Sequence, residues 1–186
     1  MEKDVLKGAI CYLIGAIDFA PDKGKNWRRD LIETSKKAGL SIKYFDPTNK
    51  IEGLKSEVDT ESNVLNKLRR EHKWDEMSNF MSTIVRQDHR CQDISDFVIF
   101  FLDISTHTCG SYFELKSALD QKKPYFIIIP QGKEKLPSWL FGIINHNFVF
   151  DNISSVISYL VDLNTGKKLL SNRWVLIRKQ IKEMEI

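Results

Sequence analysis

Two carboxylates in the segment from Asp88 to Glu114 have the clearest chemical potential in this sequence. Glu114 follows Gly110 and Ser111 and falls one helical turn into an amphipathic segment. Near a helix N-terminus the helix dipole favours the ionised form of a carboxyl group. A carboxylate held in this way is a candidate nucleophile, whereas on an ordinary surface helix it would be a solvated side chain.

Two apolar runs predict where Glu114 lies. The run 97–102 has the length and composition of a fully buried strand, and the run 125–129 is a second one. The first strand, the helix that contains Glu114 and the next strand form one unit, which the right-handed crossover rule makes a parallel pair. Because ligands bind outside the carboxyl ends of such strands, we expect Glu114 beside a binding crevice.

The rest of the pattern alternates strands and helices. The expected elements are strand 9–14, helix 26–38, strand 41–45, two helices over 60–94 that meet near Lys73 and Trp74, a short helix near 136–143, strand 147–150 and helix 152–162. This order predicts a single-domain, three-layer α/β fold of the flavodoxin or Rossmann type, with a mainly parallel five-stranded sheet. The domain is expected to span residues 1–165, with a helical insertion at 46–94 and a basic tail at 166–186 that is helical at its end.

Composition narrows the class of protein. The chain has 186 residues, enough for one domain, and a net charge of +3, too small to indicate a nucleic-acid partner. Cys11, Cys91 and Cys109 have no CxxC spacing, no signal peptide is evident, and no stretch approaches ~20 apolar residues, which favours a cytoplasmic protein with no membrane partner. The four histidines lack metal-ligand spacing and no nucleotide fingerprint is visible, so we expect no metal and no cofactor.

Several motifs together resemble the nucleoside 2-deoxyribosyltransferase family. The matching segments are Tyr12-Leu13-Ile14-Gly15-Ala16, Arg86-Gln87-Asp88 before Asp93-Ile94-Ser95-Asp96, Gly110-Ser111-Tyr112-Phe113-Glu114 with Ala118, and Lys123-Pro124-Tyr125-Phe126-Ile127. The resemblance covers residues 8–160, and its strongest part is the spacing of the two carboxylates and the glycine–serine pair. It implies the family's α/β fold and an enzyme whose partner is a small-molecule nucleoside or nucleotide.

The resemblance also implies roles for individual residues. In that family a glutamate attacks the anomeric carbon of a 2′-deoxyribonucleoside and expels the base, and a second base or water then attacks from the same face. By resemblance Glu114 is the nucleophile, Asp88 transfers protons to and from the base, and Tyr12 orients the Glu114 carboxylate. Such chemistry needs an anion beneath an oxocarbenium-like carbon and a proton donor for the leaving base. The residues expected to bind substrate are Gly15, Ala16, Asp18, Gly110, Ser111, Thr108 and Asn147.

Two positions bear on substrate choice and assembly. Thr108 stands where the family commonly has an aspartate that contacts the base, so base selection is expected to be altered. Asn147 lies where the family often lends residues to a neighbouring active site, which favours a homo-oligomer, although a loop cap explains that residue equally well.

Other interpretations stay open at this point. A 5′-monophosphate is an alternative substrate, whose phosphate Ser111, Lys25, Arg28 or Arg29 would bind, although such basic clusters are usually solvated faces. The chain is alternatively a non-catalytic module that sequesters a nucleotide, or a glycohydrolase of NAD-type dinucleotides. Taken singly, Asp88 is typical of a salt-bridge residue, Tyr12 of a packed core aromatic and Asp18 of a helix or turn cap.

Overall fold

The computed structural model describes residues 4–50, 54–55 and 58–176. Their strands form one parallel sheet in the order β2-β1-β3-β4-β5. The strands are β1 (Ile10–Gly15), β2 (Lys43–Phe45), β3 (Phe97–Phe101), β4 (Tyr125–Ile128) and β5 (Val149–Phe150). β1 and β4 are buried along their whole length and β3 along all but its last residue, as expected for strands of a parallel sheet that is covered on both faces.

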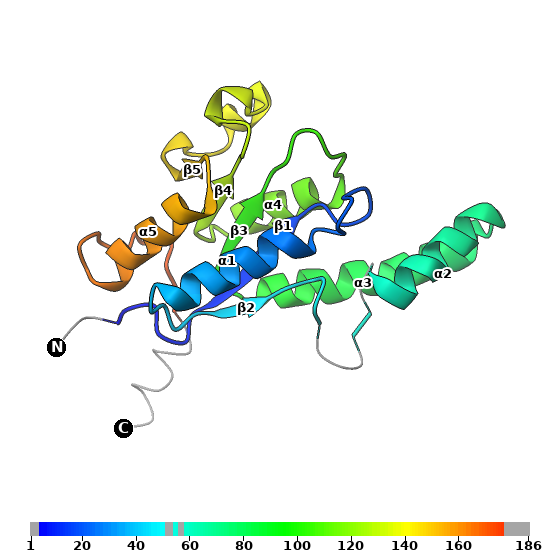
Figure 1. Ribbon diagram of the computed structural model, residues 1–186, viewed down its shortest axis with the longest axis horizontal. Helices are drawn as coiled ribbons and strands as arrows, with labels where there is room; N and C mark the ends of the chain where they lie inside the picture. Colours follow the sequence, from blue (N-terminus) through cyan, green and yellow to red (C-terminus); the bar gives the residue numbers. More distant parts are fainter. Residues whose placement is uncertain (1–3, 51–53, 56–57, 177–186) are drawn as a thin grey trace.

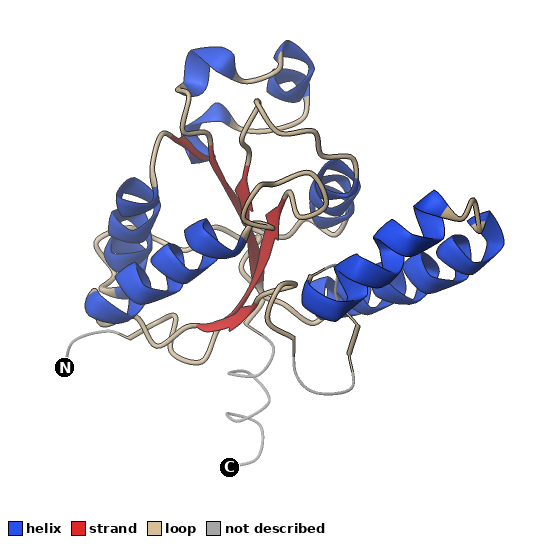
Figure 2. Cartoon of the chain, turned by 45° about the vertical axis from the view of Figure 1, so that its right-hand side comes forward, coloured by secondary structure: helices blue, strands red, loops and turns tan. Residues whose placement is uncertain are grey.

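Helices cover both faces of the sheet (Figure 2). α1 (Lys25–Lys37) and α5 (Ile153–Asn164) pack on one face, where Leu13 and Ile99 meet Leu31 and Leu160. α4 (Gly110–Asp120) covers the other face, and Leu140 of the 3-10 helix η2 (Ser138–Gly142) packs into the same core. Two further 3-10 helices, η1 (Lys133–Lys135) and η3 (His146–Phe148), lie between β4 and β5 in the chain. The alternation of side chains along a strand separates these two cores. The predicted three-layer α/β fold with a parallel five-stranded sheet is therefore confirmed.

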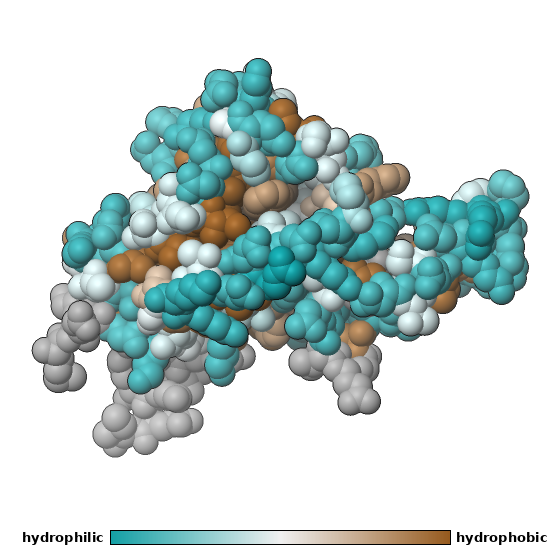
Figure 3. Space-filling model, viewed as in Figure 1, coloured by the Kyte–Doolittle hydropathy of each residue, from teal (hydrophilic) through white to brown (hydrophobic). Residues whose placement is uncertain are grey.

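A helical hairpin projects from the sheet domain (Figure 1). It consists of α2 (Asp59–Arg70) and α3 (Trp74–Asp93), which meet where His72 adopts a left-handed backbone, close to the predicted break. Leu65 and Leu68 of α2 and Ile84 of α3 are buried, whereas the side of the hairpin seen in Figure 3 is largely hydrophilic. The C-terminal part of α3 approaches α4, and this brings the hairpin to the edge of the sheet where Glu114 lies.

The structure differs from the sequence-based expectation mainly at the last strand. The predicted strand 147–150 is reduced to the two residues of β5, because the Asn145 side chain accepts a hydrogen bond from the Asn147 backbone and closes a 3-10 turn. The short helix expected near 136–143 is also a 3-10 helix. In the tail, Trp174 packs against Phe97 and Phe126, while the helical end expected for it lies outside the described residues. None of the described helices is long and apolar enough to cross a bilayer.

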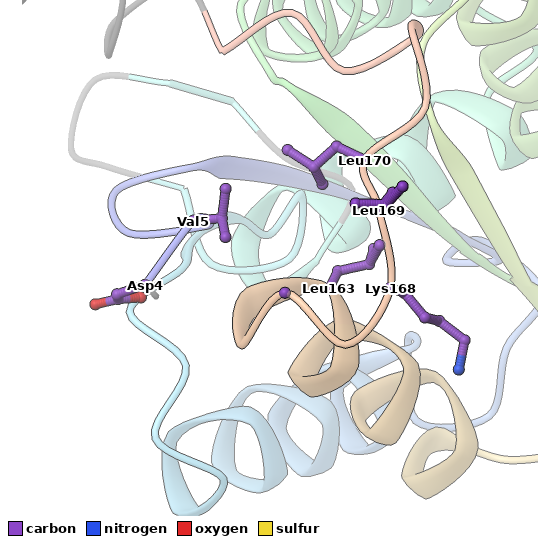
Figure 4. Close-up of a pocket in the computed structure, with 7 residues that line it drawn as sticks. Asp4, Val5, Leu163, Lys168, Leu169 and Leu170 are labelled. Carbon is purple, nitrogen blue, oxygen red and sulfur yellow. The ribbon is translucent and has the colours of Figure 1, made fainter. Parts of the chain in front are cut away.

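A cavity of about 450 Å³ lies between the N-terminal segment and the segment that follows α5 (Figure 4). Its described lining consists of Asp4, Val5, Leu163, Gly166, Lys168, Leu169 and Leu170. Lys168 forms an ion pair with Asp162 at 2.7 Å. Because these side chains offer mainly aliphatic surface, the larger cleft described next is the better candidate for chemistry.

Candidate active site

A cleft of about 750 Å³ opens at the carboxyl ends of β1 and β3. In the strand order of this sheet the chain turns to opposite sides after β1 and after β3, and open α/β sheets bind their ligands at this switch point. Four segments supply most of the lining: the loop after β1, the inner side of α3, the loop that leads from β3 to α4, and α4 itself. Their described lining residues with polar or aromatic side chains include Asp18, Phe19, Asp88, His89, His107, Thr108, Ser111, Phe113 and Glu114.

Glu114 lies half-buried in this cleft and is held from two sides. The Tyr12 hydroxyl donates a hydrogen bond to Glu114 Oε1 at 2.5 Å, and Gln92 Nε2 donates one to the Glu114 backbone carbonyl at 2.8 Å. Tyr12 reaches Glu114 because alternate β1 side chains point to the α4 face of the sheet. Burial, followed by the negative charges of Glu114 and Asp88, raises the pKa of Tyr12 well above its ordinary value. Its hydroxyl therefore stays protonated and remains a hydrogen-bond donor.

Asp88 lines the same cleft from α3 and forms an ion pair with Lys50. The distance between Lys50 Nζ and Asp88 Oδ1 is 2.6 Å, and both side chains are largely buried. Burial raises the pKa of Asp88, and the positive charge of Lys50 opposes this shift. The free-energy cost of protonating Asp88 is therefore smaller than the cost of protonating an exposed aspartate.

The α2–α3 hairpin closes one side of the cleft through contacts with the loop after β1. Arg69 of α2 forms a two-pronged ion pair with Asp18, with Nη1 3.1 Å from Oδ1. The Arg69 guanidinium lies 6.0 Å from the Phe19 ring centroid, and Phe19 makes an edge contact with His107. In the loop before α4, Thr108 donates a hydrogen bond to Ser111 Oγ at 2.6 Å.

Arg28 is a supporting residue that sequence reasoning missed. We expected it in a basic cluster that either faces solvent or binds phosphate, but its side chain is completely buried. The guanidinium donates hydrogen bonds to the backbone carbonyls of Gly24, Leu13 and Gly15 at 2.8, 3.3 and 3.0 Å. A signal was present in the sequence, because Arg28 falls on the same helical face as the buried residues Leu31 and Ser35.

Two glycines let the chain pack tightly below the cleft. A Cβ on Gly15 would lie 2.7 Å from the Trp27 ring, which stacks on Phe101 with a centroid distance of 4.9 Å. Gly24 has a left-handed backbone, and a Cβ there would lie 2.4 Å from the Ala16 carbonyl oxygen. Ala16 therefore contacts the start of α1 and is not among the described cleft residues.

The structure brings most of the sequence-predicted residues together. Those that line the cleft are Gly15, Asp18, Asp88, Thr108, Gly110, Ser111 and Glu114. Asn147 lies apart in η3, within the turn that it forms with Asn145. Among the described residues, no group of three or more histidine, cysteine, aspartate or glutamate side chains is placed to hold a metal ion.

Two of the other phosphate candidates, Lys25 and Arg29, are outside the described cleft lining. Lys25 forms an ion pair with Asp59 at 2.8 Å, and Arg29 forms one with Asp30 at 3.3 Å. Both side chains are substantially exposed, which agrees with the solvated face that such basic clusters usually form.

The fold matches solved structures of 2-deoxyribosyltransferases. The enzyme from Bacillus psychrosaccharolyticus is 14% identical, with a TM-score of 0.53 over 81% of this chain and 92% of that chain. The enzyme from Leishmania mexicana is 18% identical, with a TM-score of 0.51 over 83% of this chain and 98% of that chain. At these identities the likeness shows a common fold. No protein-family model matches the chain, and no curated protein sequence does.

Proposed function

We propose that this protein cleaves the N-glycosidic bond of a 2′-deoxynucleoside through a covalent intermediate on Glu114. The observation that carries the proposal is the Glu114 carboxylate, which is held by the buried Tyr12 hydroxyl in the same cleft as Asp88. The fold shared with 2-deoxyribosyltransferases supports the same chemistry. The sugar passes to another base or to water.

In the first step a Glu114 oxygen attacks C1′ of the sugar as the bond from C1′ to the base nitrogen breaks. The Tyr12 hydroxyl fixes the carboxylate, and covalent capture replaces one difficult displacement by two easier ones. Asp88 delivers a proton to the leaving base. In the second step the incoming base or water attacks C1′ from the face that the first base left. It gives its proton to Asp88 and releases Glu114 as a carboxylate.

The aromatic side chains at the cleft suit a flat nucleobase. Phe19 and Phe113 line the cleft, and about two thirds of each side chain is exposed (61% and 67%). Large apolar side chains exposed at a cleft with a few polar groups are typical of ligand sites, and aromatic rings stack on bases of any sequence. We therefore assign these two rings to contact with the base.

A panel experiment tests the proposal. The protein is mixed with each common 2′-deoxynucleoside, with and without a second free base, and the products are separated by chromatography while the intact protein is weighed by mass spectrometry. We expect free or exchanged base and a protein species that is heavier by one deoxyribosyl group. Tight binding without base release or adduct would instead favour the sequestering module, and a requirement for a ribose 2′-hydroxyl would favour the dinucleotide glycohydrolase.

Charge at the cleft favours nucleosides over 5′-monophosphates. The charged residues of the described lining are Asp18, Arg28, Asp88, Glu114, Lys116 and Asp120, four carboxylates against two cations. Lys116 already forms an ion pair with Asp120 at 2.5 Å, and the Arg28 guanidinium donates to backbone carbonyls. Arg69 and Lys50 are paired in the same way with Asp18 and Asp88, so a phosphate dianion would compete with carboxylates for these cations and would face the negative charge of Glu114.

We expect kcat/KM for a 5′-monophosphate to be at least about tenfold below that of the matching nucleoside, which corresponds to ~1.4 kcal/mol of unfavourable electrostatic energy. The two substrates are compared at the same pH and ionic strength. Because salt screens such repulsion, raising the ionic strength should narrow the difference. A monophosphate that reacts faster than its nucleoside would contradict the charge argument.

Tyr12→Phe tests the contact that positions Glu114. Phenylalanine keeps the buried ring but removes the hydroxyl that bonds Glu114 Oε1. A hydrogen bond to a charged group contributes about 1.5–3 kcal/mol, so we expect kcat to fall roughly 10- to 100-fold. The fall should appear in single-turnover rates of adduct formation, with a thermal midpoint close to that of the unmodified protein. Unchanged adduct formation would exclude the positioning role.

A further inference from the structure

Lys50, the ion-pair partner of Asp88, has no role in the mechanism above. Lys50 lies in the segment after β2, and its side chain is only 6% exposed. Its ammonium group is 2.6 Å from Asp88 Oδ1 and donates a hydrogen bond to the Lys55 backbone carbonyl at 2.7 Å. The Lys55 backbone N–H in turn donates to Gln87 Oε1 at 3.0 Å. Lys50 is thus fixed against α3 beside the residue to which we assign proton transfer.

We propose that Lys50 acts through Asp88 as the reservoir of the proton that the leaving base takes up. This inference rests on the proposed function. An Asp88 carboxylate that faces a lysine ammonium holds no proton of its own, but the pair as a whole holds a transferable one. Burial raises the pKa of the Asp88 carboxyl, so Asp88 accepts a proton more readily than an exposed aspartate would.

The proton balance is complete within this pair. As the bond from C1′ to the base nitrogen breaks and the bond to Glu114 forms, the base takes a proton from Asp88 and Asp88 takes one from Lys50. The base leaves in its neutral form, and Lys50 is left as a neutral amine beside the Asp88 carboxylate. In the second step the proton lost by the incoming base or water returns through Asp88 to Lys50.

The geometry makes Lys50 a positioning residue that does not itself contact the substrate. Asp88 is among the residues that line the cleft, whereas Lys50 lies behind it and is not among the lining residues described. The positive charge of Arg28 also opposes the rise in the pKa of Asp88, but a guanidinium does not give up a proton in proteins. Lys50 is therefore the better source of the proton.

Lys50→Arg separates proton supply from charge, because arginine keeps the positive charge but cannot be deprotonated. Two substrates are compared: the 2′-deoxynucleoside that the protein cleaves fastest, and 4-nitrophenyl 2-deoxyriboside, whose phenolate leaves without protonation. General acid catalysis contributes about 10²–10⁴-fold, so we expect Lys50→Arg to lower the nucleoside rate roughly 10²-fold and the nitrophenyl rate less than about threefold. Lys36→Arg, an exposed lysine of α1, is the matched control and should leave both rates unchanged.

Three other outcomes overturn the proposal in distinguishable ways. An equal fall with both substrates would mean that Lys50 only supports the structure of the cleft, and thermal melting of Lys50→Arg would show the matching loss of stability. A nucleoside rate that survives in Lys50→Arg would show that the proton comes from elsewhere. A wild-type protein inactive on both substrates would overturn the proposed function together with the relay.

Discussion

Glu114→Gln is expected to abolish base release while leaving the fold intact. An amide has nearly the shape of the carboxylate, and its oxygen can still accept the hydrogen bond from Tyr12. It carries no negative charge and cannot form the ester with C1′, so the covalent path is closed. We expect kcat to fall at least about 10³-fold, which corresponds to ~4 kcal/mol in the activation barrier. Base release is followed by chromatography, and the deoxyribosyl adduct in the intact mass should disappear.

Glu33→Gln is the matched control for this substitution, since Glu33 is an exposed carboxylate of α1 outside the described cleft lining. It makes the same chemical change and should retain full activity. Both variants should melt at the temperature of the unmodified protein, because Glu114 is only half-buried. If Glu114→Gln released base at the rate of the unmodified protein, the covalent mechanism would be excluded.

The sheet and the location of the cleft could be predicted from sequence because their signals are local. The runs 97–102 and 125–129 are continuously apolar, and such runs are typical of strands that are buried on both faces. Glu114 lies one helical turn into the segment that follows the buried strand 97–102, and topology rules place the start of that segment at the carboxyl edge of the sheet. The same reasoning located Gly110 and Ser111, whereas Thr108 was singled out by the family resemblance.

The ion pairs of the cleft could not be predicted in this way, because each joins segments far apart in the chain. Lys50 lies in a polar stretch that looks like an ordinary loop, and only the folded chain places it 2.6 Å from Asp88. The Asp18–Arg69 pair likewise depends on how the α2–α3 hairpin meets the loop after β1. Asp88 forms a salt bridge, as is typical of aspartate, and it also lines the cleft. A salt-bridge role and a role in proton transfer are therefore compatible for this residue.

Arg28→Met is expected to produce the largest loss of stability among single substitutions at the base of the cleft. The side chain is fully buried, and its Nε lies 3.5 Å from Asp46 Oδ1 in addition to its three bonds to backbone carbonyls. Methionine fills a similar volume but leaves those carbonyls without their donor and the Asp46 carboxylate without its cation. Removing one partner of a buried pair costs about 3–5 kcal/mol. At roughly 2–4 °C per kcal/mol for a domain of this size, the thermal midpoint should fall on the order of 10 °C.

Arg29→Met is the matched control, because the same change is made one residue along α1 at a side chain that is 60% exposed. Exposed ion pairs contribute about 0–1 kcal/mol, so its midpoint should move little. Arg28→Lys should recover only part of the loss, since an ammonium cannot reproduce the planar fork that reaches several carbonyls. Equal midpoints for Arg28→Met and Arg29→Met would show that the buried guanidinium contributes no net stability.

The location of these contacts links stability to the active site. The Leu13 and Gly15 carbonyls belong to the end of β1, the strand that carries Tyr12, while Asp46 directly follows β2. Arg28 therefore connects α1 to the carboxyl ends of both strands. In this way it holds β1 in the position from which the Tyr12 hydroxyl contacts Glu114. For this reason we expect Arg28→Met to lose activity at temperatures below its own midpoint, as the end of β1 loosens before the whole domain unfolds. Activity and circular dichroism are measured against temperature on the same sample. In Arg28→Met the activity should be lost at a lower temperature than the circular dichroism signal, whereas in Arg29→Met both should be lost at the same temperature.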